Sequence, residues 1–429
     1  MLEGVGAEIG DEVEIRAGEK TYRGILMARY ELADPGYIVI KLPNGYNVGI
    51  RVSEVKEIRK LASAKKPRFI PPPRPPAKPG LPKVMVMSTG GTIASRIDYR
   101  TGGVRAAITA EDLLSIVPEL YDLADLDAKI LFSLFSEDMT PHHWNEMAKE
   151  VDSLIRKGFD GVVITHGTDT MGYSAAALSF ALQKPPIPII FVGAQRSSDR
   201  PSSDAATNLI AAVRVAGHAP FAEVCVAMHA WHSDTVIAVH RGTRVRKLHT
   251  SSRDAFKSVN ADPIAYVADG EIKVNARGLN PRGSNEYSFK PGFSPDAALV
   301  KFYPGMPADL LEILVERGCR GIILEGTGLG HVNTSFTPLI KRLVERGVFF
   351  GMTSQCIYGR INMRVYDTGR DLLKAGVVPL DDMLPETAYV KLSWALAQVK
   401  DLEEVKELML APIAGELGNR SMPSREVTT

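Results

Sequence analysis

The chain has few cysteines, and no sign of charge predominates. Its 429 residues include only three cysteines, Cys225, Cys319 and Cys356, which are far apart and form no CxxC pattern. This usage favours a reducing compartment and provides neither a disulfide framework nor a zinc site. Lys+Arg 51 and Asp+Glu 50 leave a formal net charge of +1. Overall electrostatics therefore do not indicate a protein that binds nucleic acid or membranes.

Long apolar segments are also missing. The longest apolar runs, such as 187–192, are far shorter than the roughly 20 residues that a membrane helix needs. The stretch 1–12 carries acids and glycines where a secretory signal would have a basic start and an apolar run. We therefore expect a cytoplasmic protein.

Proline marks the strongest boundary in the chain. Eight prolines lie between Pro67 and Pro82, and the basic residues around them have no acidic neighbour. A segment this rich in proline forms an extended, semi-rigid spacer rather than a helix or a central strand. We predict a proline-rich basic linker at 63–83 between two bodies. Positive charge of this kind most often keeps a segment soluble, and docking to the phosphates of a nucleic acid is the alternative.

The residues before the linker predict a small β-barrel. Short runs of β-branched and aromatic residues alternate with polar ones, and Pro43-Asn44-Gly45 is typical of a tight hairpin turn. No cluster of catalytic side chains occurs there. We therefore predict a small β-barrel adaptor domain at 1–62.

The pattern after the linker changes to strands, loops and helices in alternation. Continuous apolar runs such as Val84–Met87 and Gly161–Ile164 predict buried parallel strands, and helical periodicity follows them. The fold class is therefore α/β, with a small N-terminal β-barrel followed by two α/β domains with mostly parallel sheets. We place the larger domain, with the catalytic residues, at 84–280, a smaller C-terminal α/β domain at 281–415, and a tail at 416–429.

Two strand ends carry small polar residues that could perform chemistry, because ligands of open α/β sheets bind beyond the carboxyl ends of the strands. The first reads Ser-Thr-Gly-Gly-Thr-Ile-Ala-Ser at 88–95, where the paired glycines would let backbone N–H groups approach a ligand and Thr92 would present its hydroxyl. The second reads Thr-His-Gly-Thr-Asp-Thr-Met at 165–171. Asp169 would there stay ionised near a helix N-terminus and bind an ammonium group.

Either segment alone also has a structural interpretation, because glycine pairs in turns and Thr or Asp at helix N-termini are common. A hydroxyl nucleophile needs a proton acceptor, and the sequence has no G-x-S-x-G elbow with a Ser, His and Asp order. A lysine in a poorly solvated site could take that role.

Four motifs together resemble the bacterial-type L-asparaginase family. They are the two segments above, Val-Gly-Ala-Gln-Arg at 192–196 followed by Asp204 and Asn208, and Ala-Phe-Lys-Ser at 255–258. The likeness runs from about residue 83 to residue 411. It implies that the two α/β domains are asparaginase-like and that the chain hydrolyses an amide.

The resemblance implies catalytic roles for individual residues. Thr92 would be the nucleophile, and Thr168 and Asp169 would work with Lys247. Lys257, inside the Ala-Phe-Lys-Ser segment, is the competing assignment for the lysine.

Three further positions match family residues that contact the substrate. Tyr99 would come from the family's mobile loop, and Ser136 and Glu137 would grip the amino-acid end of the substrate. Glu137 departs from the pattern, because several asparaginases carry Gln there. The resemblance implies no metal and no cofactor in this chain.

Features outside the plain asparaginase pattern resemble the D subunits of archaeal glutamyl-tRNA(Gln) amidotransferases. They are the β-rich front domain, the basic proline linker, and the segments 353–360 and 367–370. This resemblance implies a glutaminase that passes ammonia to a partner chain, the E subunit (GatE), where ATP and Mg are expected and Glu-tRNA(Gln) becomes Gln-tRNA(Gln). It also implies a homodimer of this chain within a heterotetramer, with tRNA(Gln) bound through the complex and no membrane.

Two alternatives compete with this hypothesis. A stand-alone cytoplasmic L-asparaginase would use the same catalytic residues. A non-enzymatic protein could instead bind phosphate at Gly90-Gly91 and RNA at the front domain, but the sequence has neither G-x-x-x-x-G-K-[ST] nor G-x-G-x-x-G.

The remaining reactive side chains are predicted to be structural. His166 is expected to orient backbone rather than to transfer protons. Cys356, which has no evident partner base, is expected to be a buried, inert thiol. Four histidines with no carboxylate or cysteine at a metal-ligand spacing are expected to have structural or surface roles: His229, His232, His240 and His249.

Overall fold

The computed structural model describes residues 5–27, 34–43, 46–63, 78–91, 95–97, 104–106, 117–196 and 202–420. The chain divides into two compact units: 1–74 with 95–108, and 75–94 with 109–429. Several predicted features lie outside the described residues: Thr92, Tyr99, the turn at Asn44-Gly45, most of the linker at 63–83, and 421–429.

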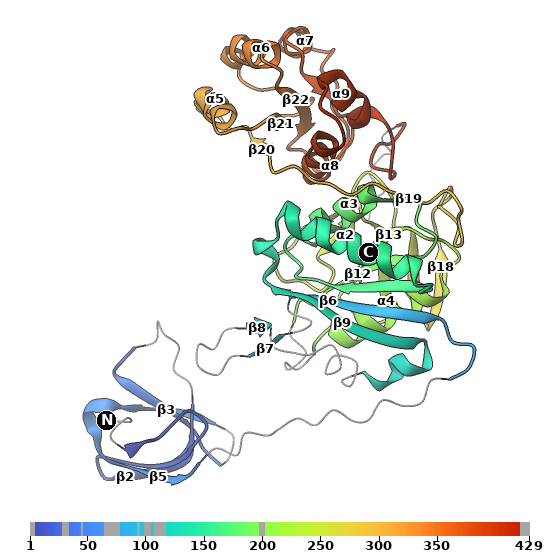
Figure 1. Ribbon diagram of the computed structural model, residues 1–429. Helices are drawn as coiled ribbons and strands as arrows, with labels where there is room; N and C mark the ends of the chain where they lie inside the picture. The colour runs from blue at the N-terminus through green and yellow to red at the C-terminus, as the bar shows by residue number, and fades with distance from the viewer. Residues whose placement is uncertain are drawn as a thin grey trace. The chain divides into compact units, whose positions relative to one another are not determined.

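The first unit contains a five-stranded antiparallel sheet in the order β4-β3-β2-β1-β5. Its strands are β1 (Glu12–Ala17), β2 (Lys20–Leu26), β3 (Tyr37–Lys41), β4 (Asn47–Arg51) and β5 (Val55–Ala62), and η2 (Val52–Glu54) joins the last two. Alternate side chains such as Val13, Ile15, Ile38 and Ile40 are buried on one face, as the period of two in a half-buried strand requires. The sheet curls around this core (Figure 1), in agreement with the predicted barrel. A two-stranded ladder of β7 (Ser95–Ile97) and β8 (Val104–Ala106) is also assigned to this unit.

The second unit is built around an eight-stranded sheet in the order β18-β17-β14-β13-β12-β10-β6-β9. The strands in chain order are β6 (Lys83–Gly90), β9 (Asp125–Leu134), β10 (Gly161–Thr165), β12 (Ile189–Val192), β13 (Val224–His229), β14 (Val236–Arg241), β17 (Ala265–Ala268) and β18 (Glu271–Val274). The five strands β13, β12, β10, β6 and β9 pair in parallel with their neighbours. The pairs β13-β14, β14-β17 and β17-β18 are antiparallel. The sheet is therefore mixed, and its parallel half brings the carboxyl ends of the motif-bearing strands to one edge.

Among the described residues, three helices cover this sheet: α2 (Pro141–Arg156), α3 (Met171–Ala181) and α4 (Ala205–His218). Helices α2 and α3 lie on one face and α4 lies on the other (Figure 1). Helix α2 starts after Thr140, whose side chain and backbone form a capping box with His143. Its buried residues Trp144, Met147 and Val151 recur at the spacing of one helix face.

The C-terminal part has a parallel sheet in the order β20-β21-β22-β23. The strands are β20 (Ala297–Lys301), β21 (Gly321–Gly326), β22 (Phe349–Ser354) and β23 (Val378–Pro379), and the helices are α5 (Asp309–Glu316), α6 (Thr337–Glu345), α7 (Asp367–Lys374), α8 (Pro385–Gln398) and α9 (Leu402–Leu410). The prediction of two α/β domains after a β-rich domain is confirmed.

The residues that follow the predicted boundary at 280 still contact the first α/β domain. Strand β19 (Ser288–Phe289) pairs with β11 (Leu182–Gln183) of the first domain, and the Arg282 guanidinium donates to the Ala216 and Ala219 carbonyls at 2.8 and 2.7 Å. These contacts join 282–289 to the first domain, whereas the carbonyls of Lys290, Pro291 and Ser294 accept hydrogen bonds from α8. The second sheet begins at Ala297.

The tail predicted from 416 also begins too early. Glu416 is fully buried and forms an ion pair with the equally buried Lys391 of α8. The Glu416 carboxylate also accepts hydrogen bonds from the backbone N–H groups of Ile413 and Ala414 at 3.0 and 2.7 Å. The hydrophobic pattern missed this residue because a buried ion pair has no apolar signature. Among the described helices, none is long and apolar enough to cross a membrane.

Candidate active site

The first motif follows β6, where two glycines turn the chain against the second motif. Gly90 and Gly91 have φ angles of +110° and +84°, which side-chain-bearing residues rarely adopt. A Cβ on Gly91 would lie 2.4 Å from the Gly167 nitrogen, so only glycine allows this approach. The structure thus places the residue before Thr92 directly against the second motif, while Thr92 itself lies outside the described residues.

The second motif follows β10 and leads into α3. Thr168 is buried, whereas the next residue, Asp169, is exposed. The N-terminus of α3 begins two residues later, at Met171. The Asp169 carboxylate therefore lies near a helix N-terminus, as the sequence predicted.

Lys247 reaches the second motif from β15 (Val245–Lys247). This strand pairs with β16 (Phe256–Ser258), and the fully buried Phe256 lies opposite Lys247. The Lys247 ammonium donates to Thr168 Oγ1 at 2.8 Å and to Asp169 Oδ1 at 2.9 Å. The lysine side chain is 13% exposed and the aspartate side chain 69%. A largely desolvated amine thus touches a hydroxyl and a carboxylate, which is an arrangement suited to moving a proton.

Lys257, the competing lysine, is engaged elsewhere. Its ammonium donates to the Ala230 carbonyl and to Asp254 Oδ2, both at 2.9 Å, and lies 5.2 Å from the centre of the Trp231 ring. The geometry therefore favours Lys247 over Lys257 as the lysine of this site.

Ser136 lies against the second motif, at the end of β9. It begins η5 (Ser136–Asp138), is buried, and accepts a hydrogen bond at its carbonyl from Thr170 Oγ1 at 2.6 Å. A Cβ on Gly167 would lie 2.7 Å from the Ser136 Cβ. Glu137 follows it with an exposed side chain. Both residues are thus close to the second motif, whereas Tyr99 lies outside the described residues.

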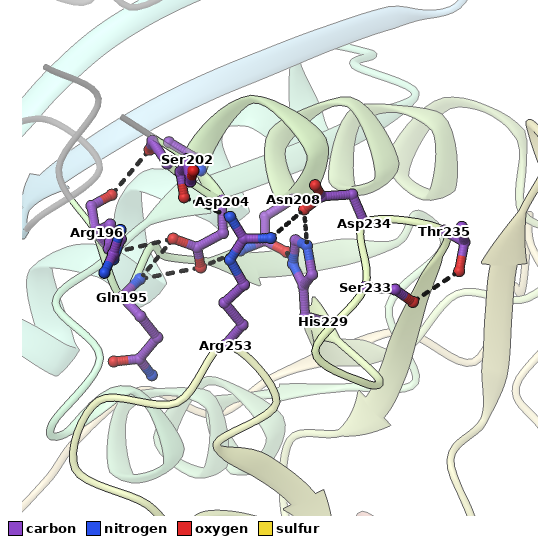
Figure 2. A network of polar contacts seen from close by, with 12 residues as sticks. Gln195, Arg196, Ser202, Asp204, Asn208, His229, Ser233, Asp234, Thr235 and Arg253 are labelled. Carbon is purple, nitrogen blue, oxygen red and sulfur yellow. Dashed lines mark hydrogen bonds and ion pairs between the residues drawn. The ribbon is translucent and has the colours of Figure 1, made fainter. Parts of the chain in front are cut away.

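The third motif closes the other side of Thr168. A Cβ on Gly193 would lie 2.9 Å from Thr168 Cγ2. The turn that follows is held by Asp204, whose carboxylate accepts the Gln195 and Arg196 backbone N–H groups at 3.0 Å. Asn208 then donates to the Gly193 carbonyl at 3.0 Å. Figure 2 shows these side chains converging on the turn.

The same network extends from Asn208 to the loop after Lys247. His229 Nδ1 lies 2.6 Å from Asn208 Oδ1, and its Nε2 lies 2.9 Å from Asp234 Oδ1. Arg253 donates to the same Asp234 oxygen at 2.6 Å (Figure 2). Sequence reasoning missed Asp234 and Arg253, because neither belongs to a motif or to a periodic pattern.

The other histidines also have structural contacts. His240 Nδ1 lies 2.8 Å from Ser258 Oγ, and His249 Nδ1 accepts the backbone N–H groups of Ser251 and Ser252 at 3.0 and 2.8 Å. The side chain of His232 is 82% exposed. In the part of the chain that the structure describes, no group of three or more His, Cys, Asp or Glu residues could hold a metal ion.

Two predictions about reactive side chains have different outcomes. His166 is fully buried and bonds the Gly167 carbonyl through Nδ1 at 2.7 Å, so it does orient backbone. Cys356 was expected to be buried, but it is exposed, because the loop after β22 turns outward there. That expectation was wrong.

Comparisons with known proteins show which family the chain is similar to. The family model described as Asparaginase, N-terminal matches residues 83–279, and the Glutaminase/Asparaginase C-terminal domain matches 296–409. The GatD N-terminal domain matches 7–61. Two relatives, from Pyrococcus furiosus and Thermococcus kodakarensis, are named as the D subunit of glutamyl-tRNA(Gln) amidotransferase. Each is 51% identical, over 99% and 97% of this chain and 98% and 96% of their own.

The chain belongs to the family of glutamyl-tRNA(Gln) amidotransferase D subunits. Solved L-asparaginases share the fold of its second unit. The enzymes from Thermococcus kodakarensis and Vibrio cholerae both align with a TM-score of 0.70, at 34% and 30% identity, over 78% and 79% of this chain and 99% of theirs. Membership of this family confirms the resemblance, the asparaginase-like α/β fold and the expectation of an asparaginase-type amidohydrolase.

Proposed function

We propose that this chain hydrolyses glutamine and that the released ammonia converts Glu-tRNA(Gln) to Gln-tRNA(Gln) at a partner subunit. The contact of the Lys247 ammonium with Thr168 Oγ1 and Asp169 Oδ1 carries the catalytic part of this proposal. The transfer part is supported by relatives that match almost the whole chain and are named as the D subunit of that amidotransferase.

In the proposed reaction, the Thr92 hydroxyl attacks the side-chain amide carbon of glutamine. The hydroxyl proton passes to Lys247 through Thr168, the C–N bond breaks, and ammonia leaves with a proton returned by the lysine. A water molecule then hydrolyses the resulting ester, which releases glutamate and restores the Thr92 hydroxyl.

The amino-acid end of glutamine would be held beside this relay. Asp169 would bind the α-ammonium group, and Ser136, Glu137 and Tyr99 would complete the substrate contacts. The exposure of Asp169 and the proximity of Ser136 to Gly167 support this placement.

We further propose a homodimer of this chain within a cytoplasmic heterotetramer that contains the E subunit (GatE) and binds tRNA(Gln). ATP and Mg would act at the partner, with no cofactor in this chain. Free glutaminase activity would waste glutamine, so the site should be weakly active until the partner and the charged tRNA are bound. A hundredfold gain corresponds to about 2.7 kcal/mol of preferential binding to the active state.

A stand-alone L-asparaginase is the second candidate. The alignment of solved L-asparaginases over 99% of their own chains supports this candidate. That enzyme would hydrolyse asparagine at full rate without any partner.

One measurement separates the two candidates. Ammonia release from glutamine and from asparagine is compared for the isolated chain and for the chain co-purified with its partner and glutamyl-tRNA. We expect glutamine hydrolysis that rises about a hundredfold in the complete complex. Equal rates in both states, or rapid asparagine hydrolysis by the isolated chain, would exclude the coupled amidotransferase and favour the asparaginase.

A further inference from the structure

A row of buried polar side chains lies behind the peptide that joins Gly167 to Thr168. Trp144 of α2, Ser174 of α3 and His166 after β10 are each at most 4% exposed. Trp144 Nε1 lies 3.1 Å from Ser174 Oγ, Ser174 Oγ lies 2.9 Å from His166 Nε2, and His166 Nδ1 lies 2.7 Å from the Gly167 carbonyl oxygen. The row thus joins two helices to the loop that carries Thr168.

The chemistry of its two ends fixes the direction of the hydrogen bonds. An indole N–H only donates and a carbonyl only accepts, so Ser174 accepts from Trp144, and His166 Nδ1 carries the proton given to Gly167. Burial lowers the pKa of His166 to about 4, so the ring is neutral at pH 7 and Nε2 keeps a lone pair. The Ser174 hydroxyl must then donate to Nε2. Each donor in the row therefore points toward Gly167.

Ser174 departs from the usual behaviour of a buried helical serine. Five residues further along α3, the buried Ser179 donates to the carbonyl of Ala175 in its own helix at 2.7 Å. Ser174 has the same option in the preceding turn, but its hydroxyl is directed at His166. The second serine of the same helix therefore provides a natural control.

We propose that Trp144, Ser174 and His166 are positioning residues that set the orientation of the Gly167-Thr168 peptide, and with it the Thr168 hydroxyl relative to Lys247. No described peptide bond is cis. In a planar trans peptide the Thr168 N–H points opposite to the Gly167 carbonyl, so fixing one group fixes the other. The inference rests on the proposed function, because it assigns the row to the same site.

The remaining sides of the loop are closed by close approaches. A Cβ on Gly167 would lie 2.7 Å from Ser136 Cβ, and one on Gly91 would lie 2.4 Å from the Gly167 nitrogen. These contacts restrain the loop on one side, and the hydrogen bond from His166 Nδ1 restrains the Gly167 carbonyl. Loss of that bond should therefore disturb catalysis more than substrate binding, because small misplacements of a catalytic group cost rate.

The test compares Ser174→Ala with Ser179→Ala in the complete complex. We expect Ser174→Ala to lower kcat for glutamine hydrolysis about tenfold or more with KM changed less than about twofold, and Ser179→Ala to leave both within about twofold. Ser174→Thr, which restores a hydroxyl, should recover most of kcat. If Ser174→Ala does not fold, Trp144→Phe removes the first donor but keeps an aromatic ring, and it should lower kcat about threefold at an unchanged KM.

A second readout does not depend on activity. The chain has three tryptophans, so hydrogen exchange of the Trp144 indole N–H can be followed by NMR beside that of Trp394, whose indole donates to the Lys290 carbonyl at 2.9 Å. Ser174→Ala should speed exchange at Trp144 at least tenfold and leave Trp394 unchanged. If the wild-type protein hydrolyses no amide, the proposed function is wrong. The effect of Ser174→Ala on hydrogen exchange of the Trp144 indole N–H then tests by itself whether these side chains are hydrogen-bonded as described. Equal kcat values for the two serine variants would overturn the positioning role. So would a Ser174→Ala variant that raises KM and leaves kcat unchanged.

Discussion

Lys247 Nζ lies 2.8 Å from Thr168 Oγ1, although the two residues are 79 positions apart in the sequence. Because one hydrogen bond joins them, the two side chains should act as a unit. We expect Thr168→Val and Lys247→Met each to lower kcat about 10²–10⁴-fold and the double variant to cost little more than either alone. Single-turnover kinetics of the three variants measure this coupling. Losses that multiply would show that the two residues act independently.

Lys257 offers a matched control for the lysine assignment. Its ammonium is bound to Asp254 and to the Ala230 carbonyl, so Lys257→Met should leave kcat within about threefold while Lys247→Met removes most activity. The two variants differ only in the position of the same substitution. A larger loss in Lys257→Met would transfer the role of base to that lysine.

Thr92 follows the paired glycines at the end of β6, and the family resemblance implies that it is the nucleophile. Thr92→Val should abolish amide hydrolysis and leave the melting temperature nearly unchanged, because only a hydroxyl is replaced by a methyl group. Thr92→Ser keeps a hydroxyl and should retain measurable turnover. Near-normal activity of Thr92→Val would rule out an acyl-enzyme at this position.

Two buried histidines should make stability depend on pH. Burial lowers the pKa of His166 to about 4; burial, and secondly the charge of Lys257, lower the pKa of His240 to about 3. Both are neutral in the folded protein, whereas the unfolded chain takes up protons below about pH 6.5. The free energy of unfolding should therefore be constant above about pH 6.5 and fall as pH drops toward 4, by about 3 kcal/mol for each histidine.

Denaturant unfolding between about pH 7 and pH 4.5 measures this effect. The slope of the unfolding free energy with pH measures how many protons unfolding takes up, and His240→Asn should reduce that number by up to one. The same substitution at His232, whose side chain is 82% exposed, should leave the slope unchanged. The same slope for wild type and His240→Asn would contradict the prediction.

The buried pair of Lys391 and Glu416 predicts that the end of the described chain is needed for stability. Glu416→Ala would leave the Lys391 ammonium buried without its carboxylate, and we expect a loss of about 3 kcal/mol or more. Glu407→Ala, at an exposed position of α9, should change stability by less than about 0.5 kcal/mol. Equal effects of the two substitutions on the denaturation midpoint would contradict the role of the ion pair.

The sequence by itself determined the fold class and the motif residues. Buried parallel strands such as Val84–Met87 are continuous apolar runs, which periodicity identifies directly. Gly90 and Gly91 were identifiable because strand-end glycine pairs permit φ angles and approaches that other residues do not. The match of four ordered motifs then selected Thr168 and Asp169 without any knowledge of distances.

Only the tertiary structure shows that Lys247, and not Lys257, contacts Thr168. Both lysines lie near the same motif, and strand pairing sets which ammonium reaches Thr168. It also showed that Glu416 is buried and that Cys356 is exposed. The row formed by Trp144, Ser174 and His166 has no local signature, because its members come from two helices and a loop that meet only after folding. Polar contacts between elements that are distant in the sequence depend on how those elements pack. The pattern of apolar residues along the sequence therefore does not predict such contacts.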